Sequence, residues 1–314
     1  MSPSVYTRVF KIALKGGERL NNSPLRYPGG KNKLTPFVSL LIEKTNIENP
    51  IYVEPFAGGA GVALNLLING VVDEIVINDY DKAIYSVWKA LLNETERFIE
   101  FIETAPLTID EWKNQKQIYL NSRKYSFELG VATFYLNRTN HSGILSAGPI
   151  GGYEQHGKFL IDARFNRPRL VEKVRLISEF KSKIHIYNKD VRSFVNNYLD
   201  KYIDNAFVYF DPPYFNKGKE LYKNYFNYKD HQEISQLVRQ LGCPWMVTYD
   251  NVDEIINLYG EYTCKYFDLN YSVANNGKKS EIMFLSDDNL YPTDEELSRH
   301  NISINIREGY NNDH

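Results

Sequence analysis

Asp211-Pro212-Pro213-Tyr214 directly follows an apolar run, Ala206 to Phe210, and this junction limits the folds open to the chain. Five consecutive apolar residues predict a strand that is buried on both faces, as in a parallel sheet. The two prolines remove two backbone N–H donors and fix φ, so the strand ladder cannot continue past Asp211. The chain must therefore turn out at the carboxyl edge of the sheet, which is where ligands bind in open α/β folds.

Other apolar runs alternate with helical patterns on both sides of this strand. Strands are predicted at 51–53, 74–78, 184–187, 244–248 and 280–285, and helices at 62–69 and 82–92. This alternation predicts an α/β fold with a Rossmann-like parallel sheet and helices on both faces. Between 94 and 183 helical patterns dominate. We therefore expect a discontinuous α/β domain, 21–93 and 184–290, interrupted by a mostly helical insertion, 94–183, with peripheral tails at 1–20 and 291–314.

A glycine-rich turn, Glu54 to Gly61 (EPFAGGAG), follows the first strand and opens a helix. Glycine lets a ligand approach the backbone closely, and helix N-terminal N–H groups can meet carboxylate or phosphate. Asp79 closes the next strand, where an acidic side chain accepts hydrogen bonds from ribose hydroxyls in doubly wound folds. Together they indicate a nucleoside-containing ligand. On these two features alone a nicotinamide dinucleotide stays open, and so does a tight turn with Asp79 as a solvated residue or helix N-cap.

The four residues after the apolar strand are explained together by an amine-binding pocket. An exocyclic amine on adenine is a poor nucleophile because its lone pair is delocalised into the ring. The Asp211 carboxylate and the Pro212 carbonyl can each accept one N–H of that amine and localise the lone pair toward an incoming methyl group. The Pro-Pro step holds these acceptors rigid, and Tyr214 can stack on the base, which must first leave the duplex. The alternative is a plain strand terminator, in which Asp211 and Tyr214 are incidental.

Four segments in this order resemble the Dam-type (D12 class) DNA adenine methyltransferases: Arg26 to Lys31 (RYPGGK), Glu54 to Gly61, Asn78-Asp79, and Asp211 to Tyr214 (DPPY). The resemblance covers residues 24 to 285. It implies a class I methyltransferase sheet, S-adenosyl-L-methionine as cofactor and double-stranded DNA as partner. It also implies transfer of a methyl group to adenine N6 in a specific DNA sequence, by base flipping and direct displacement.

The resemblance implies roles for single residues. Asp79 would hold the ribose hydroxyls, Lys31 would lie near the methionine carboxylate or a phosphate, and Asp190 would contact the adenine of the cofactor. Each has a structural alternative; Asp190, for example, could cap a helix that begins near Val191. The implied catalytic residues are Asp211, Pro212 and Tyr214, and the implied cofactor-binding residues are Tyr27, Lys31, Phe56, Gly58, Gly59, Asp79, Asp190 and Asp211.

In this family the helical insertion reads the target sequence through a loop that enters the DNA. The corresponding residues here are Arg138, Asn140, His141 and Ser142. His141-Ser142 replaces the aromatic–Asn pair of the best-known members, and the Gly-rich stretch 148–157 also differs, so the GATC site is not assigned to this chain. Residues 158–183 carry eight basic and three acidic side chains, a surplus that suits phosphate contacts but also suits a solvated helix face.

Composition and motif content argue against several other classes. A net charge of −2 excludes a generally basic DNA-binding protein but allows a local basic surface. Cys243 and Cys264 cannot form a disulfide framework or a four-cysteine zinc site, and Cys243-Pro244 reverses the Pro-Cys step of cytosine-C5 methyltransferases. The six His are scattered, so no metal site is predicted. The N-terminal residues lack an apolar run long enough for a signal peptide or membrane span, so we expect a soluble, cytoplasmic protein.

Several alternatives stay open. The same pocket could methylate cytosine N4, an rRNA guanine N2 or a protein amide. Asp rather than Asn or Ser at 211, together with the helical insertion, favours adenine in DNA. A catalytically silent DNA-binding relative should carry degraded motifs, and the motifs here are intact. Neither the recognition site, nor the oligomeric state, nor the existence of a cognate restriction endonuclease as a partner follows from the sequence.

Overall fold

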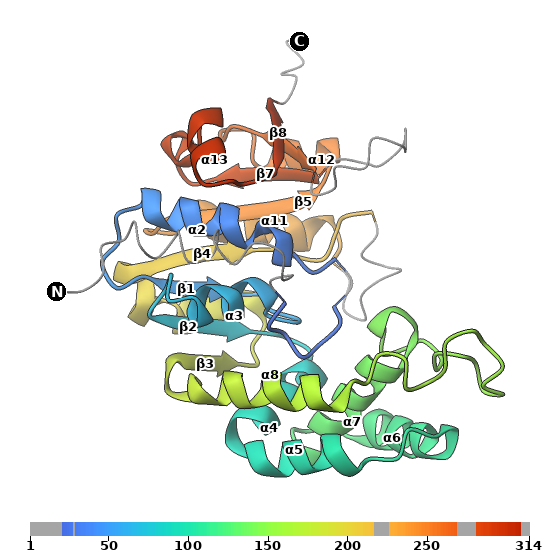
Figure 1. The fold of residues 1–314 in the computed structure, drawn as a ribbon. Helices are drawn as coiled ribbons and strands as arrows, with labels where there is room; N and C mark the ends of the chain where they lie inside the picture. The colour runs from blue at the N-terminus through green and yellow to red at the C-terminus, as the bar shows by residue number, and fades with distance from the viewer. Residues whose placement is uncertain (1–20, 28, 217–225, 269–280, 309–314) are drawn as a thin grey trace.

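The computed structural model describes residues 21–27, 29–216, 226–268 and 281–308, which form an eight-stranded sheet of order β3-β2-β1-β4-β5-β7-β6-β8 (Figure 1). β1 to β5 are mutually parallel. β7 runs antiparallel to β5 and β6, and β8 runs antiparallel to β6. The strands are β1 (Ile51–Glu54), β2 (Glu74–Asn78), β3 (Ile184–Tyr187), β4 (Ala206–Phe210), β5 (Trp245–Asp250), β6 (Lys265–Asp268), β7 (Glu281–Leu285) and β8 (Asn305–Glu308).

The strand order reverses between β1 and β4, and this reversal positions the site. From β1 the chain builds outward to β2 and β3, whereas β4 and β5 extend the sheet in the other direction. Val53 of β1 pairs with Val76 of β2 and Val208 of β4, so the carboxyl ends of the three strands lie side by side. Loops that leave adjacent parallel strands toward opposite faces open a crevice between them. A ligand is therefore expected just beyond Glu54 and Phe210.

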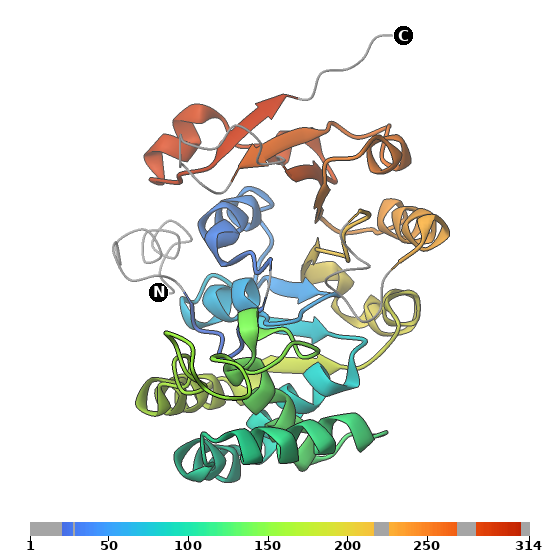
Figure 2. The same cartoon turned by 90° about the vertical axis from the view of Figure 1, so that its right-hand side faces the viewer.

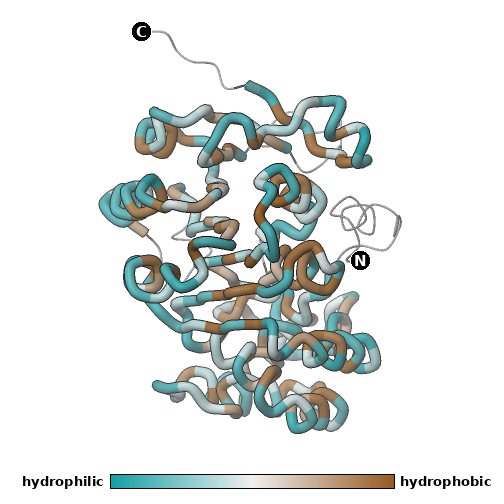
Figure 3. Tube along the Cα trace, turned by 90° about the vertical axis from the view of Figure 1, so that its left-hand side faces the viewer, coloured by the Kyte–Doolittle hydropathy of each residue, from teal (hydrophilic) through white to brown (hydrophobic). Residues whose placement is uncertain are grey.

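Helices cover both faces of the sheet because the central strands are apolar on both sides. All five residues of β4 and all six of β5 are buried. Figure 1 shows the helices on either side of the sheet, and Figure 3 shows the hydropathy of the same residues along the chain. The expected Rossmann-like α/β class is thus confirmed. One face packs against α2 (Thr35–Lys44) and α3 (Gly61–Ile68), and the other against α9 (Val191–Tyr198), α11 (Tyr228–Arg239) and α12 (Asp253–Leu258).

The helices of the expected insertion pack beyond β3 together with α4 (Lys82–Asn93) (Figure 2). α7 lies close to α4 at Gly130, where a Cβ would come within 2.5 Å of the Ser86 carbonyl oxygen. Their buried side chains belong to the same core as the α2–α3 face of the sheet. The described part of the insertion therefore has no separate core, and its boundaries at 94 and 183 stay predictions. Its helices are α5 (Thr95–Thr104), α6 (Ile109–Asn121), α7 (Phe127–Thr139) and α8 (Arg167–Glu179).

The residues expected to form a peripheral C-terminal tail, 291–314, include regular secondary structure. They contain a helix, α13 (Asp294–Arg299), and the edge strand β8, which pairs with β6; Leu297 and Ile304 are buried. Sequence patterns missed β8 because its four residues, Asn-Ile-Arg-Glu, carry only one apolar side chain. The tail 1–20, Pro28 of the first motif, Ser280 and residues 309–314 lie outside the described residues.

Candidate functional site

A cavity of about 780 Å³ opens at the carboxyl ends of β1, β2 and β4, as the strand order requires. Its volume falls within the range of small-molecule and cofactor sites. Segments far apart in sequence meet at its wall, because the N-terminal motif, the glycine turn and the β4 terminus all contribute residues. Of the predicted site residues, Tyr27, Lys31, Phe56, Gly59, Asp79, Arg138, Ser142, Asp190 and Asp211 line it.

The glycine turn is closed by the N-terminal motif. Gly58 has a φ of +47°, and a Cβ there would lie 2.6 Å from the ring of Tyr27. A Cβ at Gly61 would lie 1.6 Å from Oδ1 of Asn32. Only glycine fits at Gly58, because both the backbone conformation and the space exclude a side chain there, whereas a Cβ at Gly61 would require the Asn32 side chain to move. The pairing of RYPGGK with EPFAGGAG, which the sequence presents only as an order along the chain, is therefore a direct contact.

Asp79 holds the glycine turn and faces the cavity. Its Oδ2 accepts a hydrogen bond from the backbone N–H of Gly58 at 2.8 Å, and its Oδ1 accepts one from Asp81 N–H at 2.8 Å. Burial, and then the charge of Asp81, raise the pKa of Asp79 to about 7. The N-cap of α4 is Asp81, whose side chain accepts from Ala83 N–H. Asp79 is therefore not the cap of α4, and its carboxylate, which lines the cavity, has the capacity to accept further hydrogen bonds.

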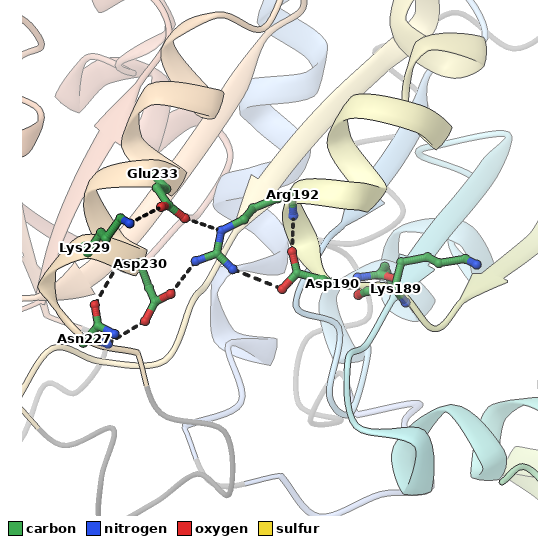
Figure 4. A network of polar contacts seen from close by, with 8 residues as sticks. Lys189, Asp190, Arg192, Asn227, Lys229, Asp230 and Glu233 are labelled. Atoms are coloured by element: carbon green, nitrogen blue, oxygen red, sulfur yellow. Dashed lines mark hydrogen bonds and ion pairs between the residues drawn. The ribbon is translucent and has the colours of Figure 1, made fainter.

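Asp190 combines capping with a place in the cavity wall. One carboxylate oxygen accepts the backbone N–H of Arg192 at 2.9 Å, which makes Asp190 the N-cap of α9. The other oxygen lies 3.2 Å from the Arg192 guanidinium, which also contacts Asp230 and reaches Glu233 at 2.6 Å (Figure 4). Arg192 thereby ties the first turn of α9 to α11. Asp230, at the other end of this network, also lines the cavity.

Asp211, which follows β4, is held at the cavity wall by Thr248 of β5 and by Lys31 of the N-terminal motif. Thr248 of β5 donates its hydroxyl hydrogen to Asp211 Oδ1 at 2.9 Å, and Lys31 Nζ lies 3.8 Å from the same oxygen. Lys31 is itself almost fully buried and bound to Tyr214 and Glu281. Burial raises the pKa of Asp211 to about 6, Lys31 opposes the rise, and Glu281 adds to it.

The residues after Asp211 leave the strand in a fixed direction. Pro212 is buried and Pro213 lines the cavity. Downstream, the backbone N–H groups of Phe215 and Asn216 donate to the two oxygens of Asp250, at 2.9 and 3.0 Å. The Tyr214 hydroxyl is bound by Lys31, whose ammonium lies 5.0 Å from the ring centre. The tetrapeptide is thus anchored at both ends.

Two acidic residues of the site were not predicted. Glu54, at the end of β1, lines the cavity, accepts a hydrogen bond from the Tyr52 hydroxyl at 3.0 Å, and has a pKa raised by burial to about 8. The signal that identified Asp79 and Asp211, an acid at the end of a parallel strand, also applies to Glu54. Glu281 carries no such signal, because it begins β7. An antiparallel strand starts at the edge where its parallel neighbours end.

The predicted DNA-contacting residues separate into two groups. His141 and Ser142 are exposed in the short helix η2 (His141–Gly143), and Ser142 lines the cavity with a φ of +54°. Asn140 is fully buried: its Oδ1 accepts from Trp112 Nε1 at 2.6 Å, and its Nδ2 donates to the Ile144 carbonyl at 2.9 Å. In this structure Asn140 has no exposed surface and supports the loop, so its predicted contact with DNA stays a prediction.

This loop docks on the N-terminal motif. Asn137 accepts the backbone N–H of Arg26 at 2.7 Å and donates to the Arg26 carbonyl at 2.8 Å. A Cβ at Gly143, where φ is +78°, would lie 2.4 Å from the same carbonyl. The loop is thereby placed beside the cavity. Arg138 extends into the cavity wall, with its guanidinium donating to the carbonyls of Pro24 and Arg164.

Two kinds of feature are absent from the part of the chain that the structure describes. No group of three or more His, Cys, Asp or Glu side chains is arranged to hold a metal ion there. Within those same ranges, no helix is long and apolar enough to cross a membrane.

Comparisons with known proteins agree with this geometry. Residues 27–273 match the family described as D12 class N6 adenine-specific DNA methyltransferase. The Type II methyltransferase M.MjaIII of Methanocaldococcus jannaschii is 27% identical over 267 residues, covering 77% of this chain and 89% of the relative. The Type II methyltransferase M1.LlaDCHI of Lactococcus lactis subsp. cremoris is 26% identical over 244 residues, 71% of this chain and 78% of the relative.

Among solved structures, the rRNA methyltransferase aviRa from Streptomyces viridochromogenes aligns with 84% of this chain and 88% of its own, at 14% identity. Its TM-score is 0.39, at which the likeness supports no inference about activity.

Proposed function

The chain belongs to the D12 class of N6 adenine-specific DNA methyltransferases, and we propose that the cavity at the ends of β1, β2 and β4 holds both its S-adenosylmethionine and its target adenine. Members of this class methylate specific DNA sites, and S-adenosylmethionine is the methyl donor. The observation that carries the proposal is the placement of Asp211. This carboxylate, directly followed by a rigid Pro-Pro step, lies at the wall of a cavity that the glycine turn also lines.

The residues of the cavity fit the cofactor. The glycine turn presents backbone without side chains, and the Asp79 carboxylate retains acceptor positions that suit two ribose hydroxyls. Asp190 lies farther along the same edge, with Phe56 also in the wall. We therefore assign Tyr27, Phe56, Gly58, Gly59, Asp79 and Asp190 to the cofactor side. When bound, S-adenosylmethionine supplies an electrophilic methyl group on a sulfonium.

Lys31 is better suited to the target side. Its ammonium is enclosed by Tyr214, Glu281 and Asp211, all of which belong to the adenine half of the cavity or its border. A cation there favours the ionised form of Asp211. We propose that Lys31 keeps the Asp211 carboxylate charged and oriented, in addition to any contact with the cofactor that its place in the cavity wall allows.

The reaction follows from the acceptors at the β4 terminus. Asp211 and the Pro212 carbonyl each accept one N–H of the flipped adenine amine, which turns its lone pair toward the methyl donor. Positive charge develops on this nitrogen as the new bond forms, and the negative carboxylate stabilises it. With a pKa of about 6, Asp211 can then take the proton that the methylated amine releases. Tyr214 is positioned beside Lys31 to stack on the base.

The direct test is methyl transfer from labelled S-adenosylmethionine to duplex DNA, followed by digestion to nucleosides. Wild-type protein should yield N6-methyladenine, Asp211→Ala should yield no product, and Asp253→Ala, which removes an exposed acid in α12, should match wild type. Label transfer that survives Asp211→Ala would refute the mechanism. N4-methylcytosine as the product would refute the assignment of the base.

A role in restriction–modification is the finer part of the proposal. Both relatives named above are Type II methyltransferases. We therefore propose that this chain is the modification half of such a system, with a cognate endonuclease that cleaves the same site. Sequencing DNA from cells that express the chain identifies the methylated site. If that DNA were still cut by endonucleases that recognise the site, the protective role would be wrong.

A further inference from the structure

Five basic side chains lie in or next to the cavity wall, and they are named here the basic cluster. Arg26 and Arg138 line the cavity, and Arg164, Arg169 and Lys173 come from the adjoining segment 164–173. The Arg138 guanidinium donates to the carbonyl of Arg164, and Lys173 Nζ donates to the Ser23 carbonyl at 2.8 Å. Arg26 Nη1 donates to the Asn140 carbonyl at 3.0 Å. The cluster thus joins α7, α8 and the N-terminal motif beside the cavity.

The basic cluster holds its charges without acidic partners. The hydrogen bonds made by Arg26, Arg138 and Lys173 go to main-chain carbonyls. Among the described residues, none of the five forms an ion pair, in contrast to Arg97, Arg175 and Arg192, which all do. In addition, Nε of Arg138 is buried without a hydrogen-bond partner. Five cations are therefore concentrated beside one cavity with unused donors.

Burial and the neighbouring cations both lower pKa values within the basic cluster. Burial lowers the pKa of Arg138 to about 10, with further lowering by Arg26, Arg164 and Arg169. Burial also lowers the pKa of Lys173 to about 8, helped by Arg138 and Arg169 and opposed only by Glu172. Holding cations in this way costs free energy that a bound anion would recover. The arrangement therefore favours a ligand that brings negative charge to the basic cluster.

We propose that the basic cluster binds the DNA phosphates that flank the flipped adenosine and so holds the strand open over the cavity. Phosphate oxygens match the free guanidinium donors, and Arg is suited to bidentate contact with phosphate. A nucleotide turned out of the duplex brings its own two phosphates to the rim of the cavity that its base enters. This inference rests on the proposed function, which supplies the flipped base.

The test uses two variants with the same loss of charge. Arg164 and Arg169 are exposed, so Arg164→Gln/Arg169→Gln should fold normally. The control, Arg175→Gln/Lys181→Gln, removes two exposed cations from the same helix and the turn after it, outside the basic cluster. Duplex affinity is measured between 50 and 200 mM salt. Each lost phosphate contact should reduce the slope of log K against log salt by about 0.9, so the cluster variant should lose about 1.8 and the control close to nothing.

A second measurement locates the phosphates. Single phosphates around the target adenine are replaced by neutral methylphosphonates. A methylphosphonate next to that adenine should weaken duplex binding by wild-type protein severalfold. The cluster variant should bind this duplex no more weakly than the unmodified one. Equal salt slopes for both variants, or losses that add at every position, would overturn the proposal.

Affinity for S-adenosylmethionine, measured on the same proteins without DNA, separates the sources of the anion. It should be unchanged in the cluster variant; a loss there with normal DNA binding would assign the basic cluster to the cofactor carboxylate instead. These are binding measurements, so they remain informative even if nucleoside analysis found a product other than N6-methyladenine.

Discussion

The protonation of Asp211 should set the acid limit of methyl transfer. Its pKa lies at about 6 instead of 3.8, because the carboxylate is buried, and Thr248 and Lys31 only partly offset that effect. In the proposed mechanism the ionised form of Asp211 both stabilises the charge on the amine and accepts its proton. The chemical rate should therefore fall as the pH drops through 6. One unit below the pKa, about a tenth of the protein is in the active form, and the rate should be reduced accordingly.

Two substitutions should move this limit in opposite directions. Thr248→Val removes a hydrogen bond to the charged carboxylate, which is worth about 1.5–3 kcal/mol, or about one to two pH units, so the acid limb should move up. Glu281→Gln removes a negative charge that raises the pKa of Asp211 and should move the limb down. Thr248→Ser keeps the hydroxyl and is the matched control.

The assay is single-turnover methyl transfer between pH 4.5 and 9 at constant ionic strength. Both S-adenosylmethionine and DNA must be saturating, because Asp79 and Glu54 also have raised pKa values and could affect binding. The assignment of the acid limb of the pH–rate profile to Asp211 would be refuted if this limb did not shift in Thr248→Val. A shift in the same direction in both variants would also refute it.

Three further outcomes follow from the same contacts. Asp211→Asn should abolish activity but raise the free energy of unfolding at pH 7 by up to ~3 kcal/mol. The gain arises because the variant avoids ionising a carboxyl group whose pKa is raised on folding. In urea unfolding, the gain should shrink as the pH falls through 6 and vanish near 3.8. Gly58→Ala should lower the free energy of unfolding by about 1–2 kcal/mol for its left-handed backbone and by a further amount for the clash with Tyr27, and it should impair cofactor binding. The double variant Gly58→Ala/Tyr27→Ala should regain only the part lost to the clash. Fully additive losses from the two substitutions would contradict this explanation. Asn140→Ala should destabilise the protein by about 2–4 kcal/mol in thermal unfolding, whereas His141→Ala should change stability by under about 0.5 kcal/mol and alter DNA affinity instead.

The strands of the parallel sheet were predictable because their signal is local. β2, β3 and β4 occupy the predicted residues, since their apolar side chains and the polar residues that follow them lie within a few positions of one another. β6 and β8 were missed because these two four-residue strands, at the antiparallel end of the sheet, carry few apolar side chains. The sequence also did not predict that the sheet and the helical insertion share one core, because this core depends on contacts between segments that are remote in sequence.

The candidate site divides in the same way. Asp79 and Asp211 were predictable because an acid at the end of a parallel strand must face the ligand edge. The burial of Asn140 as a support of its loop depends on Trp112, which lies 28 residues away in sequence. The partnership of Lys31 with Glu281 joins residues 250 positions apart. No local pattern could report either of them.

Asp211-Pro212-Pro213-Tyr214 shows where the sequence stops and the tertiary structure begins. By itself the sequence determined the strand and its end, because proline geometry and apolar burial act over a few residues, and it led to the hypothesis of an amine-binding pocket. Only the tertiary structure decided the charge state of Asp211, through Thr248, Lys31 and Glu281, and the gathering of unpaired cations beside the cavity. Electrostatic effects depend on distance in space and on burial, and both come from the folding of distant segments onto one another.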